Sequence, residues 1–155
     1  MTADSAPVRQ SERHEILYRL MLVASFVGQD FSTRFGRHRV TLPEWRVLLE
    51  LHREGADSAA AIARRTGLSA MGVSRAVATL LEAGRILRTP DPSDGRRQSL
   101  ALSPRGRQLV ARILPDGEAV AALLLTRVPD ADRPALAAML DAMLAAAREG
   151  PWEGA

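Results

Sequence analysis

The sequence contains no cysteine and no lysine, few aromatic residues and no long apolar run. Without cysteine there is no disulfide framework, no thiolate metal site and no cysteine redox switch, so we expect a reducing, cytoplasmic setting. No apolar run approaches the ~20 residues that a membrane-spanning helix needs, and we predict no membrane partner. Because aromatic residues make up only 4% of the 155, the core must be aliphatic and rich in alanine, which favours helices.

The sequence also lacks the motifs of common catalytic sites. It has no glycine-rich phosphate loop, no nucleophile elbow and no cluster of acidic residues and histidines at metal-binding spacing. Its three histidines are scattered along the chain. We therefore predict that the chain is not an enzyme and has neither a cofactor nor a metal.

All 21 basic residues are arginines, although the net charge is only +3. The guanidinium group is a planar fork of donors that suits phosphates and guanine edges. A net charge this small does not identify a nucleic-acid partner, so the positions of the arginines have to decide.

Residues 11–36 carry apolar side chains at helical spacing, in a band too wide for one face of a small monomer. Such a helix often packs on a second subunit, so we predict a dimerisation helix here. Residues 1–10 precede it as a disordered lead, and no apolar segment follows their charges as a secretory signal requires. The band contains Ile16, Leu17, Leu20, Met21, Val23, Ala24 and Val27.

Three short helices follow within 44 residues, with few residues between the last two, which predicts a helix-turn-helix. Thr41–Glu44 is a capping-box pattern with Pro43 in the first turn. The second helix starts at Asp57 or Ser58 and the third at Ser69, and glycines at 55, 67 and 84 end the three.

Residues 86–89 and 98–102 are typical of a β-hairpin with a long tip. Ser103-Pro104 then starts a helix that reaches about Thr126, and Pro129-Asp130 starts a last one over about 131–148. We predict a mainly α fold with a small β-hairpin wing. A winged helix-turn-helix at 41–102 lies between dimerisation helices at 11–36 and 103–148, with a flexible tail at 149–155.

The helix after Ser69 has the pattern of a DNA-reading helix. Val73, Val77, Leu80 and Leu81 define its core side, and Arg75 points away from them. The residues around Arg75 are small and uncharged, as entry into a major groove requires, whereas a helix facing only water usually carries several charges. The alternative is a solvated helix whose small residues follow from composition. The predicted contacts are Ser69, Met71, Ser74, Arg75 and Thr79.

The hairpin tip, DPSDGRR, carries Arg96 and Arg97 side by side. A loop that only reverses the chain does not need two arginines, whereas a loop beside a recognition helix can insert them into a minor groove. Solvent-facing charges are the alternative.

Asp94-x-Arg96, Leu102-Ser103 and Gly106 resemble the D-x-R-(x)5-L-T/S-x-x-G stretch of MarR-family transcription regulators. TLPEWRVLLEL looks like the second helix of that family and residues 61–84 like its reading head, so the resemblance covers about Ser11 to Arg148. It implies an obligate homodimer that binds pseudo-palindromic double-stranded DNA. The resemblance implies by position that Arg96 is the wing arginine and that Asp94 is the carboxylate that orients it through a charge-assisted hydrogen bond. At Gly95 this chain departs from the family, whose members often carry another arginine there.

Family members often lose DNA affinity when a small anion, commonly an aromatic acid, binds between the dimer helices and the reading head, and others sense thiol oxidation. Without cysteine, a ligand is the expected input. A candidate pocket combines His14 and Tyr18, near Met21 and Ser25, with Trp45, Arg46 and His52; ordinary packing and solvent exposure are the alternatives. The predicted function is a homodimeric repressor released by an aromatic acid-like ligand. An activator, or an interaction module without ligand response, stays open.

Overall fold

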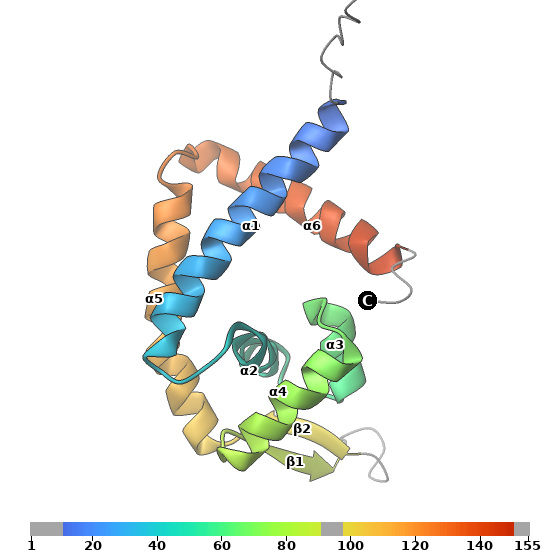
Figure 1. Ribbon diagram of the computed structural model, residues 1–155, viewed down its shortest axis with the longest axis vertical. Coiled ribbons are helices and arrows are strands. Elements are labelled where there is room, and N and C mark those ends of the chain that lie inside the picture. The colour runs from blue at the N-terminus through green and yellow to red at the C-terminus, as the bar shows by residue number, and fades with distance from the viewer. Residues whose placement is uncertain (1–10, 91–97, 151–155) are drawn as a thin grey trace, which may run out of the picture.

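The computed structural model describes residues 11–90 and 98–150 as six α-helices, one 3-10 turn and a two-stranded hairpin (Figure 1). The predicted lead at 1–10, the hairpin tip and most of the predicted tail lie outside the described residues. The elements are α1 (Glu12–Gly36), α2 (Leu42–Glu54), α3 (Ala59–Thr66), α4 (Ala70–Glu82), β1 (Ile86–Pro90), β2 (Gln98–Leu102), α5 (Pro104–Leu125), η1 (Asp130–Asp132) and α6 (Arg133–Glu149).

Each of the first five helices begins where a hydroxyl side chain caps it, because the first backbone N–H groups of a helix have no partner inside it. At α2 the cap is a full capping box, since Thr41 accepts from the Glu44 N–H and the Glu44 carboxylate accepts from the Thr41 N–H. Of the two predicted starts of α3, Ser58 is the cap. The five caps are Ser11, Thr41, Ser58, Ser69 and Ser103.

Two helix boundaries in the structure differ from the predicted ones. The last helix begins at Arg133, and a 3-10 turn precedes it where the sequence pattern suggested the helix itself. Gly36, predicted to stop the first helix, is its last helical residue, and Arg37 is the C-cap. The basic connector then turns through Arg39, which has a positive φ of 52°.

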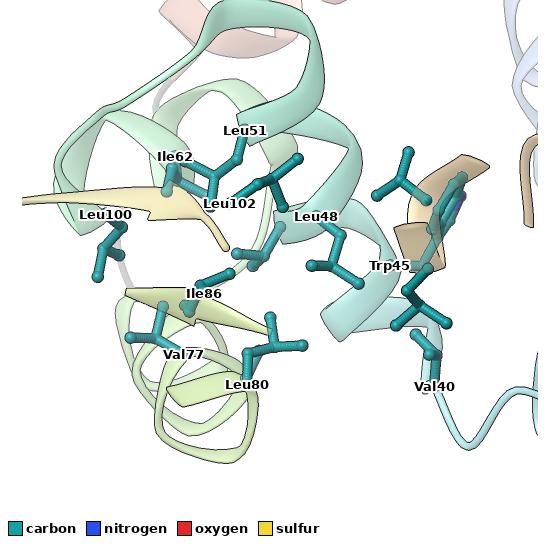
Figure 2. Packing of buried hydrophobic residues seen from close by; sticks show 14 of the residues in the cluster. Val40, Trp45, Leu48, Leu51, Ile62, Val77, Leu80, Ile86, Leu100 and Leu102 are labelled. Atoms are coloured by element: carbon teal, nitrogen blue, oxygen red, sulfur yellow. The ribbon is translucent and has the colours of Figure 1, made fainter. Parts of the chain in front are cut away.

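The helices and hairpin from 41 to 102, which we call the head, supply most of the hydrophobic core, and the end of α1 and the first half of α5 complete it (Figure 2). Leu48, Ile62 and Leu80 are fully buried, and burial of each stabilises the fold by about 1.5–3 kcal/mol. The core is mainly aliphatic, as predicted, but it is not rich in alanine, because Ala61 and Ala76 are the two alanines among its buried described residues. Phe35 and Trp45 stack with ring centroids 5.1 Å apart and join the end of α1 to the head.

Helices α1, α5 and α6, which we call the arm, lie on one side of the head, with α5 packed along α1 (Figure 1). The first half of α5 buries Leu109, Val110 and Ile113 in the core, but most of the other large apolar side chains of the arm are exposed. Phe35 is the one buried residue of α1, and α6 has none. Phe26 and Leu123 are each about two-thirds exposed. No helix in the described part of the chain is both long and apolar enough to span a bilayer.

Candidate nucleic-acid interface

The outward face of α4 is built as the helical period predicts. Val73, Val77 and Leu80 are buried, and Leu81 is half-buried at the edge of the core. The opposite side exposes five residues: Met71, Ser74, Arg75, Ala78 and Thr79. Within residues 70–79, all of which the structure describes, Arg75 is the only charged side chain. The helix therefore presents an uncharged surface apart from one guanidinium group, and Met71 is its other long side chain.

Local contacts hold the side chains on this face. The Arg75 guanidinium donates to the Met71 sulfur at 3.2 Å, and the Thr79 hydroxyl donates to the Arg75 carbonyl at 3.2 Å. Ser69 caps the helix by accepting from the Gly72 N–H at 3.1 Å. Arg75 has no carboxylate partner among the described residues, so its charge is available to an external acceptor.

The turn before α4 fixes the angle between α3 and α4. Gly67 caps α3 in the left-handed region, with φ of 66°, a conformation that residues with a Cβ rarely adopt. Leu68 and the Ser69 cap follow at once, so only three residues separate the two helices. The predicted helix-turn-helix is therefore present.

The hairpin lies beside α4 with β1 and β2 antiparallel, and Ile86 opposite Leu102. Ile86 and Leu100 point into the core (Figure 2). The strands end at Pro90 and Gln98, so the predicted wing residues Asp94, Arg96 and Arg97 lie outside the described residues. Their contacts with DNA stay a prediction.

The structure explains the spacing of Leu102, Ser103 and Gly106 after the wing. The Ser103 hydroxyl lies 2.7 Å from the Gly84 carbonyl and accepts from the Gly106 N–H at 3.0 Å, while the Ser103 N–H donates to the Arg85 carbonyl. A Cβ on Gly106 would lie 1.9 Å from the Arg85 carbonyl oxygen. Only glycine lets the start of α5 approach the base of the hairpin this closely.

Arg65 connects its own helix, α3, to α2 and to the α2–α3 connector. Its guanidinium is bonded to Glu50 of α2 and to Asp57 in the α2–α3 connector. Burial alone raises the pKa of Asp57, but hydrogen bonds from Arg65 and the Ser58 N–H outweigh it and hold the pKa below its usual range. The same two carboxylates raise the pKa of Arg65.

The connector between arm and head is held from both sides. Asp116 of α5 pairs with Arg37 and with His38. Hydrogen bonds from both residues lower the pKa of Asp116, and the bond from Arg37 has the larger effect. From the head, Arg85 donates to the carbonyls of His38 and Arg39. The head is thus fixed to the arm by charged contacts as well as by the Phe35–Trp45 stack.

Comparison with known proteins decides the family. The MarR family model matches residues 39–97. A helix-turn-helix-type transcriptional regulator of Mycobacterium tuberculosis is 30% identical over 112 residues, which cover 72% of this chain and 78% of that protein. This chain belongs to the MarR family. Its relatives are transcriptional regulators, not enzymes.

Solved structures share the fold of this MarR-family chain. CouR from Rhodococcus jostii, bound to p-coumaroyl-CoA, matches 87% of this chain and 95% of its own with a TM-score of 0.78 and 21% identity. BpsR from Bordetella bronchiseptica, whose DNA binding is regulated by 6-hydroxynicotinic acid, matches 83% of this chain and 98% of its own with a TM-score of 0.73 and 22% identity. The predicted winged-helix fold is confirmed.

Two residues that the sequence pattern did not single out line a cavity beside α4 in this MarR-family chain. Arg88 and Gln98 line a cavity of about 320 Å³ together with Ser74 of α4. Strand alternation provides the signal for Arg88, because residues 86 and 88 lie on the same face of β1 and Ile86 is buried toward α4. Gln98 is the first residue after the undescribed tip and had no comparable signal.

The predicted ligand residues are spread over the chain. His14 and Tyr18 are exposed on the first half of α1, as are Met21 and Ser25 further along it. Trp45 is 5% exposed and packs on Phe35 inside the core, so its indole is closed to a ligand here. Arg46 is exposed, and His52 lines a small cavity of about 230 Å³ with Arg107. A ligand pocket made of these residues stays a prediction.

Proposed function

We propose that this chain is a homodimeric repressor that reads double-stranded DNA with α4 and releases it when a small anionic aromatic ligand binds. The outward face of α4 carries the proposal. Small uncharged side chains let a helix approach base edges closely, and one arginine can donate two hydrogen bonds to a guanine. In this proposal Arg75 contacts a base, while Ser69, Met71, Ser74 and Thr79 contact the groove wall or phosphates.

The exposed apolar face of the arm supports the dimer. Monomeric proteins rarely expose contiguous apolar surface of this extent. Ile16, Leu20 and Val23 of α1 line one apolar cavity of about 480 Å³ with Leu124 of α5 and Met139 of α6. A twofold pair of heads would place two α4 helices in successive major grooves, about 34 Å apart, which requires a pseudo-palindromic site.

Selection from a random pool of duplexes, followed by binding at several salt concentrations, tests DNA reading. We expect enrichment of an inverted repeat and a linear fall of log affinity with log salt concentration, because bound arginines release counterions from DNA. Arg96→Ala should weaken binding to all sequences and flatten the salt slope. If the pool yields no enriched sequence, the chain does not read DNA sequence.

Thermal-shift measurements with 6-hydroxynicotinic acid, p-coumaric acid and its CoA thioester test the ligand step. 6-Hydroxynicotinic acid regulates DNA binding by BpsR, and p-coumaroyl-CoA is bound to CouR, two proteins of the same fold. p-Coumaric acid is the acid part of that thioester. A ligand that stabilises the protein should also lower its affinity for the selected duplex, because release requires different affinities for the free and DNA-bound conformations. Stabilisation with unchanged or increased DNA affinity would contradict release.

Transcription from a promoter that carries the selected site separates repressor from activator. With purified polymerase, a repressor lowers the transcript yield and the active ligand restores it. A rise in yield on addition of the protein would identify an activator instead.

A further inference from the structure

The Arg65 side chain of α3 bonds both to α2 and to the α2–α3 connector, and so ties the three together. Its Nε donates to a carboxylate oxygen of Glu50, and its Nη2 donates to Asp57 Oδ2 at 2.5 Å. About a third of the Arg65 side chain is exposed, whereas the two carboxylates are mostly buried. The guanidinium is therefore bonded to two mostly buried carboxylates of the head.

Asp57 passes this connection on to the hairpin through its backbone. The Asp57 N–H donates to the Leu100 carbonyl at 3.0 Å, and the Leu100 N–H donates to the Asp57 carbonyl at 2.7 Å. Its second carboxylate oxygen accepts from the Ser58 N–H at 2.6 Å. Asp57 thus forms a one-residue third strand beside β2.

The hairpin needs such a support. Two antiparallel strands alone are marginally stable in water, and further pairing or packing fixes their position. On the β1 side, Ile86 packs toward α4. On the β2 side, the strand contacts α2 and α5, and the backbone pair of Asp57 and Leu100 adds a hydrogen-bonded attachment to the segment before α3. If Asp57 is released, β2 loses the partner that sets its distance from α3.

We propose that Arg65 is a positioning residue for the wing. By holding the Asp57 carboxylate it sets β2, and with it the strand ends Pro90 and Gln98, relative to the outward face of α4. The proposal rests on the DNA reading proposed above, since it concerns how two parts of one reading surface are kept in register.

Arg64, the residue before Arg65, differs from it in exposure and in ion pairing. Arg64 is exposed and has no carboxylate partner among the described residues, as expected of a side chain free to meet a phosphate. Arg65 has its charge balanced by two carboxylates, which leaves little for a phosphate. Its influence on DNA binding must therefore be indirect, through Asp57.

Glu50 and Asp57 provide matched variants, because both accept from the same guanidinium but only Asp57 touches the hairpin. The first readout needs no DNA: amide hydrogen exchange of the Leu100 N–H, with the Val73 N–H in α4 as internal reference. Opening of the local structure sets such rates. We expect Asp57→Asn and Arg65→Gln to raise the Leu100 rate about tenfold relative to Val73, and Glu50→Gln to leave it within about twofold.

Equal acceleration in the Asp57 and Glu50 variants would overturn the proposal, because Arg65 would then only stabilise the head as a whole. Unchanged exchange in the Asp57 variant would also overturn it. If Arg65→Gln does not fold by circular dichroism, the comparison of the two carboxylate variants decides alone.

The second readout uses the duplex selected from the random pool. Hydroxyl-radical cleavage reports protection of the minor groove, and methylation of guanine N7 reports protection of the major groove. Asp57→Asn and Arg65→Gln should lose hydroxyl-radical protection at the outer ends of the site, keep guanine protection under α4, and bind about tenfold more weakly. Glu50→Gln should keep both patterns.

Joint loss of both protections in a folded variant, or loss of neither, would refute a role in positioning the wing. Failure of the native protein to protect any selected duplex is a different result. It would refute DNA reading, while the exchange measurement would still decide whether Arg65 holds the hairpin.

Discussion

A single carbonyl oxygen, that of Arg85, decides which residue can stand at position 106. The start of α5 approaches it so closely that a side chain of any size would collide with backbone, which cannot move aside as a flexible side chain can. In the sequence, Gly106 was recognisable as one position of the family motif, but nothing there explained why this position needs a glycine. The structure supplies the reason: close contact between a helix start and the base of the hairpin.

Gly106→Ala should lower the free energy of unfolding by about 3 kcal/mol, in the upper range for overpacking a tight site. Urea denaturation at fixed protein concentration measures it. Gly117→Ala, in the same helix with open space at the Cβ position, is the control and should not destabilise. A small effect at 106 would mean that the hairpin base and α5 separate easily.

The lowered pKa values of Asp57 and Asp116 predict a specific acid sensitivity. A carboxyl group whose pKa is lower when folded than when unfolded stabilises the fold above the unfolded pKa of about 3.9, and this stabilisation is lost as pH falls through the folded value. The free energy of unfolding should stay level from about pH 7 to pH 5 and fall below about pH 4. Asp57→Asn should make that fall shallower, and an identical pH profile in the variant would contradict the assignment to Asp57.

At the scale of single elements, helix starts were predictable because caps and first-turn prolines are local chemistry. The inward and outward faces of α4 were predictable for a similar reason, since the helical period depends on one segment only. The third strand residue, Asp57, was not predictable from sequence. Its pairing with Leu100 depends on how the hairpin folds back over α3, and no local pattern encodes that contact. The 3-10 turn before α6 was missed because Pro129 and Asp130 suit either helix type.

The outward face of α4 predicts a variant that changes specificity without changing the fold. Arg75→Ala should relax sequence preference by about 1–3 kcal/mol at one base pair in each half-site, because a bidentate base contact is lost. Competition with singly substituted duplexes measures this, and Arg112→Ala, an exposed arginine of the arm, is the control. Equal weakening on all duplexes would make Arg75 a phosphate contact.

At the scale of the whole molecule, head and arm differ in what their apolar residues contact. The head buries its apolar residues in a core that it shares with the first half of α5, whereas the arm presents most of its other large apolar side chains at the surface. The sequence indicated this from the overly wide apolar band of residues 11–36. It could not show which candidate ligand residues meet, since their distances depend on tertiary and subunit packing. Trp45 is an example: the sequence suggested that it lines a ligand pocket, whereas in the fold it is a core residue.

The arm predicts that charge on its surface blocks association. Phe26→Glu combined with Leu123→Glu should give a monomer in sedimentation equilibrium, because two carboxylates would have to be buried without partners. Binding to the selected inverted repeat should fall at least a hundredfold, by about 3 kcal/mol or more, as the second head is lost. Leu87→Glu, an exposed apolar position on the hairpin, is the control and should stay associated. A dimeric double variant would place the interface elsewhere.

The exposed apolar side of α6 connects the folding of this helix to the concentration of the protein. Its 17 residues have no buried side chain within the chain, and a helix of this length is marginal in water without packing. In the proposed homodimer a neighbouring copy would cover the exposed apolar side of this helix, so progressive dilution should lower the far-ultraviolet ellipticity in step with dissociation. The number of copies in a cell would then set how many complete reading units exist, which makes the expression level itself a regulatory input.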